Sequence, residues 1–262
     1  MIPETSKLQR KDPVLITGAA SGLGRALSIE FAKRGYPVVG FGRHDSSLRE
    51  TAKLAGSNFH SRVVDVGDAA AIRTAVVQSQ DDVGQISILV NNAAVYPRRD
   101  FLQETTASFM HTVAINLGGY VACTHAVLET MQITGVGRIL NVGSFADVAP
   151  LPCSAAYSVS KGAARVLTRA LVADLSDRFP DIIISDWMPG VLSTNMGLPD
   201  GMDPAVAAVW GVNLALWRDR TLNGVGFEGD TEILAPRGLK QRVKNLVFLR
   251  SSPEPRRLNM QT

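Results

Sequence analysis

Pro13-Val-Leu-Ile-Thr17 runs directly into Gly18-Ala-Ala-Ser-Gly22-Leu-Gly24, and these twelve residues are the strongest indication of the fold class. The first five residues form a short apolar strand, and residues 25–34 have the apolar spacing of a helix. A strand, a glycine turn and a helix in this order are typical of a phosphate-binding site. Glycines let the backbone approach a pyrophosphate, and a helix N-terminus offers free N–H groups. The spacing Gly-x-x-x-Gly-x-Gly differs from the Gly-x-Gly-x-x-Gly of the standard dinucleotide motif.

Apolar strands alternate with helical segments along most of the remaining chain. Further strands are expected at residues 37–41, 60–64, 86–90, 138–143, 182–187 and 225–234. Helices are expected at residues 46–55, 69–83, 104–134 and 155–178, whereas residues 191–218 are the least regular part. The alternation predicts an α/β fold, a single-domain Rossmann-type doubly wound parallel sheet of about seven strands with helices on both faces. Residues 1–235 would form this domain, and residues 236–262 a basic C-terminal tail.

Composition indicates a globular protein with a sizeable core, since 45% of the 262 residues are hydrophobic and 19% are charged. No apolar run approaches the ~20 residues of a membrane span, and residues 1–12 lack the apolar centre of a signal peptide. Cys123 and Cys153 are too few for a disulfide framework, so a cytoplasmic location is expected. Cys153 is expected to be a packing residue rather than a nucleophile, because no basic neighbour lowers its pKa.

No metal site is expected. The four histidines are scattered over different elements without the spacing of metal ligands: His44, His60, His111 and His125.

The net charge of +3 is a property of the tail, because residues 236–262 carry +6 and residues 1–235 carry −3. The body therefore has no nucleic-acid footprint. Within the tail, apolar residues recur at helical spacing among basic ones: Leu239, Val243, Leu246 and Val247. One hypothesis is a peripheral contact of this short helix with an anionic membrane. The favoured alternative is that it packs on its own body or on a neighbouring subunit, with residues 251–262 disordered.

Tyr157 and Lys161 are four residues apart in a helical segment, so their side chains share one face. An ammonium beside a phenol stabilises the phenolate, so the pKa of Tyr157 is expected to fall below its reference of about 10. That would make Tyr157 a proton donor or acceptor near neutral pH. Ser144 follows the strand at residues 138–143, and the two prolines between it and Tyr157 suggest a loop that brings its hydroxyl to the phenol.

The residue at the end of the second strand is expected to determine whether NAD or NADP binds. An acidic residue there favours the free ribose 2′-hydroxyl of NAD, and an arginine accommodates the 2′-phosphate of NADP. The position holds Arg43, so NADP(H) is favoured with NAD(H) as the alternative, although Asp45 would partly offset the charge. Ser21 is expected to support Arg43 by donating to the 2′-phosphate. Asp65, after the third strand, is expected to accept from the adenine amino group, with Asp68 the better cap for the following helix.

Asparagines mark two further positions. Asn91 and Asn92 end the fourth strand and are expected to tie neighbouring loops together, and the small residues after them would let a flat cofactor lie close. Asn116 lies in an apolar helical stretch, where an amide is costly unless it is hydrogen-bonded. It is therefore either a satisfied core group or part of the site.

With these residues together, the chain resembles the short-chain dehydrogenase/reductase family over residues 13–234. The motifs that carry the resemblance occur in the family's order: Thr17-Gly-Ala-Ala-Ser-Gly-Leu-Gly24, Asp65, Asn91-Asn-Ala-Ala94, Asn116, Ser144, Tyr157-x-x-x-Lys161, and Pro189-Gly190 with Thr194. The resemblance implies an NAD(P)-dependent oxidoreductase that interconverts a carbonyl and a secondary alcohol. It also implies a homodimer or homotetramer.

The resemblance implies a role for each of four residues. Tyr157 would be the catalytic acid/base, and Lys161 would lower its pKa and bind the nicotinamide ribose. Ser144 would hydrogen-bond the substrate oxygen, and Asn116 would hold a water in a proton relay through Lys161. The expected cofactor contacts are Gly18, Ser21, Gly22, Leu23, Gly24, Arg43, Asp65, Val66, Asn92, Ala93, Tyr157, Lys161, Pro189, Gly190, Val191 and Thr194.

The expected partner is a small carbonyl or alcohol substrate. Its candidate lining is mostly apolar and has no obvious arginine clamp for a carboxylate, which favours an apolar ketone or alcohol. The same residues are equally suited to a core: Val95, Tyr96, Phe145, Leu151, Met188, Leu192, Met196 and Met202. The alternative function is a non-catalytic nucleotide-sensing or scaffold protein on the same fold. Because degeneration would be expected to remove the four catalytic positions first, the enzyme is preferred.

Overall fold

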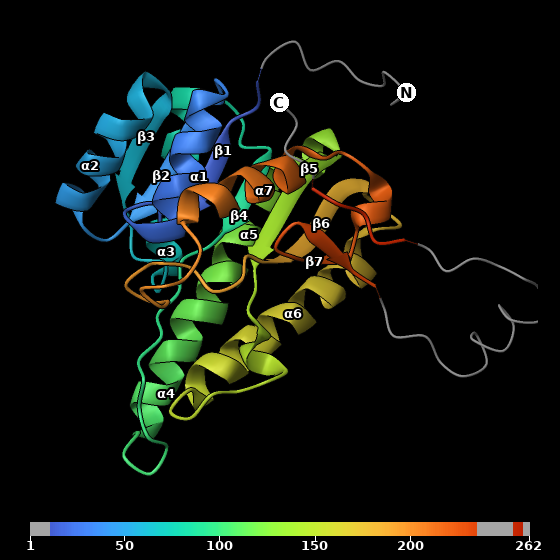
Figure 1. The fold of residues 1–262 in the computed structure, drawn as a ribbon. Coiled ribbons are helices and arrows are strands. Elements are labelled where there is room, and N and C mark those ends of the chain that lie inside the picture. Colours follow the sequence, from blue (N-terminus) through green and yellow to red (C-terminus); the bar gives the residue numbers. More distant parts are fainter. Residues whose placement is uncertain (1–10, 235–253, 259–262) are drawn as a thin grey trace, which may run out of the picture.

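A computed structural model of the chain describes residues 11–234 and 254–258. The described residues form an eight-stranded sheet in the order β3-β2-β1-β4-β5-β6-β7-β8 (Figure 1). Neighbouring strands are parallel except for the antiparallel pair β7–β8. The strands are β1 Val14–Thr17, β2 Val38–Gly42, β3 Phe59–Val63, β4 Ile88–Asn91, β5 Val136–Val142, β6 Asp181–Met188, β7 Gly226–Glu228 and β8 Thr231–Ile233. The strand order reverses between β1 and β4, and ligands of doubly wound sheets bind at this kind of switch point.

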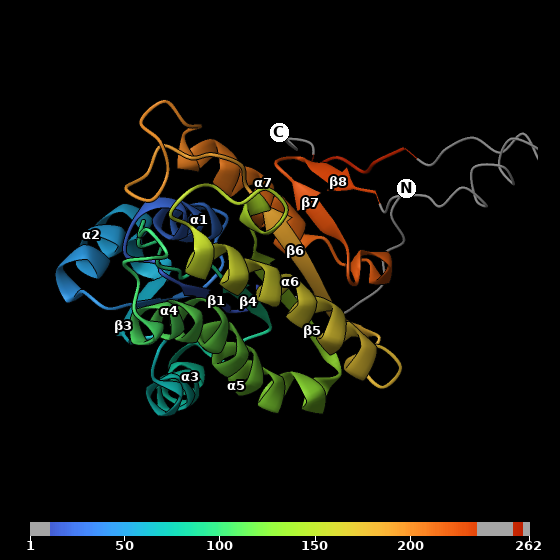
Figure 2. The same cartoon turned by 90° about the horizontal axis from the view of Figure 1, so that it is seen from below.

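Helices cover both faces of the sheet, as Figure 2 shows from below. One core cluster joins the sheet to α1, α2 and α7, and the other joins it to α3, α5 and α6. The helices are α1 Gly22–Lys33, α2 Asp45–Ala55, α3 Ala69–Val83, α4 Thr106–Val113, α5 Gly119–Thr134, α6 Ala155–Leu175 and α7 Pro204–Leu216. The Rossmann-type architecture predicted from the alternating pattern is confirmed.

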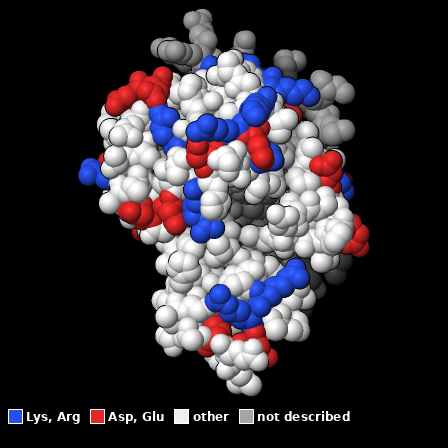
Figure 3. All heavy atoms as spheres, turned by 90° about the vertical axis from the view of Figure 1, so that its left-hand side faces the viewer, with Lys and Arg blue, Asp and Glu red and all other residues white. Residues whose placement is uncertain are grey.

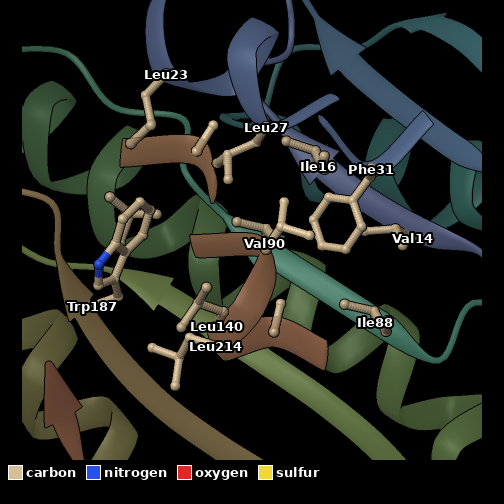
Figure 4. Packing of buried hydrophobic residues seen from close by; sticks show 14 of the residues in the cluster. Val14, Ile16, Leu23, Leu27, Phe31, Ile88, Val90, Leu140, Trp187 and Leu214 are labelled. Carbon is tan, nitrogen blue, oxygen red and sulfur yellow. The ribbon is translucent and has the colours of Figure 1, made fainter. Parts of the chain in front are cut away.

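The core under α1 and α7 illustrates why the pattern specifies this fold (Figure 4). Leu27 and Phe31 are four residues apart on α1, share one face, and are fully buried with Val14 and Ile16 of β1. Trp187 of β6 closes the same cluster, and its indole donates a hydrogen bond to the carbonyl of Gly229. The apolar strands are buried on both faces, as is usual in a parallel sheet between two helix layers.

Helix α7 was not expected, because residues 191–218 showed no clear period. It begins at Pro204 after Asp203, whose side chain accepts from the N–H of Ala205. The helix is apolar on nearly every side, since it packs against both α1 and the sheet. A helix of this composition has no polar face to produce an amphipathic pattern.

The final strand expected at residues 225–234 is two strands. Gly229 lies between β7 and β8 with a φ of +52°, which turns the chain back on itself. The sheet therefore has eight strands rather than about seven. The helix expected at residues 104–134 is also interrupted, because a π-helical turn at Ala114–Gly118 separates α4 from α5.

Part of the predicted tail packs on the body. Leu258 donates its N–H to the carbonyl of Asp230, and Arg257 pairs with Thr231 at the free edge of β8. The Arg256 guanidinium is held by the Glu232 carboxylate at 2.7 and 2.9 Å. The disorder expected for residues 251–262 is therefore wrong for residues 254–258. The amphipathic helix expected around residues 239–247, and its membrane or subunit contact, lie outside the described residues, and the 1–235 domain boundary stays a prediction.

We expect Leu258→Ala to lower the free energy of unfolding by about 3 kcal/mol, because this side chain is only 2% exposed and its loss leaves a cavity. Leu102→Ala is the matched control, since Leu102 is 93% exposed and should change stability by less than about 0.5 kcal/mol. Urea unfolding of both variants measures the difference. Equal midpoints for the two variants would show that residues 254–258 do not contribute to the core in solution.

On the face drawn in Figure 3, basic and acidic side chains are interspersed rather than gathered into one basic stripe.

Candidate active site

The carboxyl ends of β1 and β4 are tied together at the switch point of the sheet. The Thr17 hydroxyl accepts from the backbone N–H groups of Asn92 and Ala93, each at 2.9 Å. The Asn92 amide donates to the Thr17 carbonyl at 2.8 Å. The linking role expected of the asparagines is therefore confirmed for Asn92, which holds the glycine loop and the segment after β4 in one arrangement. Asn91 instead donates to Thr124 of α5 and Asn141 of β5.

The glycine loop leaves no space for side chains at two of its positions. Gly18 has a φ of +70°, and a Cβ there would lie 2.9 Å from the Asn92 amide. A Cβ on Gly24 would lie 2.1 Å from the Gly18 carbonyl oxygen and 2.6 Å from the same amide. Helix α1 starts directly after Ser21, which forms no side-chain cap, and its first turn has no acidic residue. The uncapped N–H groups and the bare backbone fit the pyrophosphate of a dinucleotide cofactor.

The side chains of Tyr157 and Ser144 form a hydrogen bond near the carboxyl end of β5. Tyr157 lies in the first turn of α6, and Ser144 follows β5 as the cap of a short turn, accepting from the N–H of Ala146 at 3.2 Å. Burial raises the pKa of Tyr157, the hydrogen bond with Ser144 lowers it in part, and Tyr96 raises it further. The fall in pKa predicted from the spacing of Tyr157 and Lys161 is therefore wrong for the chain alone, because desolvation dominates and Lys161 has other partners.

Lys161 lies in the interior, 2% exposed. Its ammonium donates to the Tyr120 phenol at 2.9 Å and to the Val142 carbonyl at 2.8 Å. Burial lowers the pKa of Lys161 to about 7, and the carboxylate of Asp186 opposes this change. Near neutral pH, Lys161 can therefore gain or lose its proton readily.

Asn116 lies in the π-helical turn between α4 and α5 and is fully buried. Its amide oxygen accepts from the Val95 N–H at 2.8 Å. Its amide nitrogen donates to the Val95 carbonyl at 2.9 Å and to the Ser160 hydroxyl at 3.0 Å. The side chain is thus a satisfied core group that also ties the segment after β4 to α6. The proton relay through a water stays a prediction.

The ring of Tyr157 is stacked on the ring of Tyr96. The two ring centroids are 4.4 Å apart, and the Arg98 guanidinium lies 5.4 Å from the Tyr96 centroid. No carboxylate of a described residue forms an ion pair with Arg98. Among the expected substrate-lining residues, Met188 and Leu192 are 1% and 7% exposed, so they belong to the core. Arg98 was missed, because sequence alone did not place it against the ring next to Tyr157.

Arg43 is exposed and lies on the wall of a cavity of about 440 Å³. Asp45, which was expected to offset its charge, forms an ion pair with Arg49 instead. Asp65 is exposed and accepts from the N–H of Gly67 at 2.9 Å, and Val66 is buried. Asp68 caps α3, as predicted. The cavity extends from Arg43 to Tyr96 and also has walls that sequence reasoning missed: His111, Thr112, Ile115 and Asn195.

The segment after β6 folds over the glycine loop. Pro189 is buried, Gly190 has a φ of +91°, and Val191 is 58% exposed. A Cβ on Gly22 would lie 3.3 Å from the Thr194 methyl group, so this side chain lies directly above the loop. The structure thus brings the expected cofactor contacts from both sides of the switch point to one place.

Cys153 is exposed rather than packed, which corrects its expected role. Cys153 comes directly after Pro150-Leu-Pro152 and has a φ of 60°, a backbone conformation that is uncommon for residues other than glycine. The described part of the chain contains no cluster of potential metal ligands. Within the same residues, none of the helices has the length and apolar character needed to cross a membrane.

Comparisons with known proteins agree with this arrangement. The family model described as short chain dehydrogenase matches residues 12–203. Sulfoacetaldehyde reductase 2 from Chromohalobacter salexigens is 34% identical over 80% of this chain and 82% of its own. Galactitol 2-dehydrogenase (L-tagatose-forming) from Cereibacter sphaeroides is 32% identical over 74% and 77%. The solved 3-ketoacyl-(acyl-carrier-protein) reductase from Brucella melitensis, complexed with NADH, has a TM-score of 0.77 at 24% identity and covers 83% of this chain and 96% of its own, a likeness of fold.

Proposed function

Because the chain belongs to the short chain dehydrogenase family, we propose that it interconverts a carbonyl and a secondary alcohol with a nicotinamide cofactor. The observation that carries the proposal is the contact of the Ser144 hydroxyl with the Tyr157 phenol, on the helix that also holds Lys161. Three polar groups of the types that the family uses thus lie at the end of the sheet where its ligands bind. The catalytic residues in the proposal are Asn116, Ser144, Tyr157 and Lys161.

The cofactor, when bound, supplies or accepts the hydride. The chain's own residues manage the charge that this leaves on the substrate oxygen. Ser144 donates a hydrogen bond to that oxygen, and Tyr157 transfers its phenolic proton to it in reduction and recovers it in oxidation. A positive charge on Lys161 makes the Tyr157 proton easier to release, and its position inside the protein strengthens this effect because water does not screen it.

The first test is a parallel fluorescence titration with NADPH and NADH, followed by turnover of a carbonyl panel with the cofactor that binds. Binding of either cofactor together with carbonyl reduction supports the proposal. Cofactor binding without turnover of any carbonyl or alcohol would favour the non-catalytic alternative. Failure to bind either NADPH or NADH would do the same.

The proposed cofactor preference is for NADP(H). Arg43 is a solvent-exposed cation on the cavity wall, and no carboxylate of a described residue is paired with it. A free guanidinium at this position suits a 2′-phosphate. Residues 18–24 of the glycine loop contain no basic residue, so the preference depends on this one side chain.

We expect Arg43→Ala to raise the KM for NADPH about tenfold or more while leaving the KM for NADH within about twofold, because only NADPH carries the phosphate. Arg49→Ala is the matched control, since Arg49 is an exposed neighbour that pairs with Asp45. Steady-state kinetics with each cofactor measure both variants. Equal effects of Arg43→Ala on both cofactors would remove Arg43 as the selecting residue.

The proposed substrate has an apolar body, because the Tyr96 ring is stacked on Tyr157 and Phe145 directly follows Ser144. Val95, next to Tyr96, lines the same cavity. Arg98 supports a second class, carbonyl compounds with an anionic end. Its guanidinium lies over the Tyr96 ring, next to Tyr157, and forms no ion pair with a carboxylate of the described residues. The similar reductase from Chromohalobacter salexigens acts, by its name, on sulfoacetaldehyde, which carries a sulfonate. The carbonyl panel should therefore pair each apolar ketone with a carboxylate or sulfonate analogue of the same length.

The homodimeric or homotetrameric assembly and the cytoplasmic location stay predictions. Size-exclusion chromatography with light scattering tests the first, and fractionation of cells tests the second.

A further inference from the structure

Tyr120 is a buried phenol in direct contact with the catalytic lysine. It lies on α5, on a different helix from Lys161, and only 1% of its surface is exposed. Its hydroxyl accepts from the Lys161 ammonium at 2.9 Å and donates to the Val142 carbonyl at 2.8 Å. The Lys161 nitrogen lies 5.0 Å from the Tyr120 ring centroid and 6.0 Å from that of Tyr157. The Lys161 nitrogen is therefore closer to the ring of Tyr120 than to the ring of Tyr157, the proposed acid/base.

The contacts of Lys161 account for two of its three N–H donors. One is directed to the Tyr120 hydroxyl and one to the Val142 carbonyl, both of which are buried. An ammonium has three donors, so one remains for a ligand or for Tyr157. Because the other two are fixed to separate elements, α5 and β5, the position of the nitrogen is set from both sides. A lysine without these contacts would have many rotamers to choose from.

We propose that Tyr120 is a positioning residue that orients Lys161 and, by accepting a hydrogen bond from its ammonium, favours the charged form. The proposal rests on the proposed function, in which the charge of Lys161 assists proton transfer by Tyr157. Tyr120 itself touches neither substrate nor reacting atoms in this arrangement; it acts through Lys161.

The groups that face Lys161 explain why a phenol is useful there. Tyr120 comes from α5, Tyr157 from the lysine's own helix α6, and Asp186 from β6. Asp186 favours the charged lysine, and its own carboxylate accepts from the Thr168 hydroxyl at 2.6 Å. Burial, with repulsion from Tyr157 and Asp186, raises the pKa of Tyr120 well above 10. Tyr120 therefore stays neutral, accepting from Lys161 without becoming a competing anion.

Removing the hydroxyl should lower the pKa of Lys161. A hydrogen-bond acceptor stabilises the ammonium but not the neutral amine, so its loss favours the neutral form. The charge on Lys161 is present below its pKa and is lost as the pH rises through it. In Tyr120→Phe this loss should occur about one pH unit lower, the change expected when one hydrogen bond to a charged group is removed.

The test compares Tyr120→Phe with wild type in carbonyl reduction across the pH range. We expect the basic limb of kcat/KM to move down by about one pH unit, with a loss of about tenfold above it that shrinks on acidification. Tyr36→Phe is the control for the loss of a tyrosine hydroxyl, because Tyr36 is a half-buried phenol that lies before β2, at the opposite end of the sheet. Superimposable pH profiles of Tyr120→Phe and wild type would overturn the proposal, and a uniform loss without a shifted limb would show a merely structural role.

A second readout does not depend on turnover. Titration of the Lys161 side-chain nitrogen by ¹⁵N NMR, with the signal assigned by its absence in Lys161→Met, should give a pKa about one pH unit lower in Tyr120→Phe. An unchanged pKa would overturn the proposal even in an active enzyme. If wild type turns over no carbonyl but the pKa shifts, the proposed function fails and the role of Tyr120 in holding Lys161 stands.

A measurement on the wild type alone covers the case in which Tyr120→Phe does not fold. The Tyr120 phenol carbon, followed by ¹³C NMR, should change its shift in the same step in which Lys161 titrates, since the two groups share a hydrogen bond. A Tyr120 signal that is flat through that step would show that the contact does not exist in solution.

Discussion

Tyr157→Phe is expected to lower kcat for carbonyl reduction by about a thousandfold, because it removes the only proton that the proposed mechanism transfers. The change deletes one oxygen and keeps the ring, so the stack with Tyr96 at 4.4 Å remains. Cofactor affinity should change by less than about threefold, since the glycine loop and the segment after β6 are untouched. Pre-steady-state kinetics and the fluorescence titration measure the two quantities separately.

Tyr96→Phe provides the matched control for this variant. It removes a hydroxyl from the ring stacked on Tyr157, so it tests whether any phenol at this place is required. We expect its kcat to stay within about threefold of wild type, because Tyr96 transfers no proton in the mechanism. Turnover by Tyr157→Phe at a rate close to that of Tyr96→Phe would overturn the assignment of Tyr157 as the acid/base.

Gly24→Ala is expected to weaken binding of NADPH by about a hundredfold or more. The alanine Cβ would lie 2.1 Å from the Gly18 carbonyl oxygen. Because this oxygen belongs to the backbone, the clash can be relieved only if the glycine loop moves. The Asn92 amide, 2.6 Å away, is itself tied to Thr17, so the displacement would spread to the segment after β4. Forcing a methyl group into packed surroundings also costs about 1–3 kcal/mol of stability.

Gly118→Ala separates this steric effect from a general effect of adding a methyl group. Nothing lies within 4 Å of a Cβ at Gly118, which has a helical φ of −58° in the turn before α5. Its affinity for NADPH and its unfolding midpoint should stay near those of wild type, since alanine is the better helix former. If Gly24→Ala bound NADPH as well as Gly118→Ala does, the glycine loop would not be the pyrophosphate site.

The order of strands and helices could be read from the sequence, because each element leaves a local pattern. The apolar strands ending at Thr17 and Asn91 and the spacing of Leu27 and Phe31 are properties of neighbouring residues, and burial between two helix layers accounts for them. The glycine loop was equally readable, since Gly18 and Gly24 are dictated by backbone conformation and close approach. Where the pattern was absent, as in the almost uniformly apolar α7, the prediction was wrong.

The candidate site was predicted as a set of residues, but its electrostatics were not. The spacing of Tyr157 and Lys161 suggested a lowered pKa for the phenol, whereas burial raises that pKa and lowers the pKa of Lys161 to about 7. Desolvation depends on how much protein surrounds a group, and the surrounding protein comes from distant parts of the chain. Local spacing therefore carries no information about it.

The sheet, the glycine loop and the identity of the polar groups at its edge thus follow from local sequence, because they depend on residues close together in the chain. The contacts of those groups depend on the three-dimensional packing of the elements. Tyr120 meets Lys161 across 41 residues, Asn116 meets Ser160 across 44, and Leu258 enters the core beside β8 from the far end of the chain. Contacts of this kind arise when separate elements pack on one sheet, and the residue pattern within each element does not predict them.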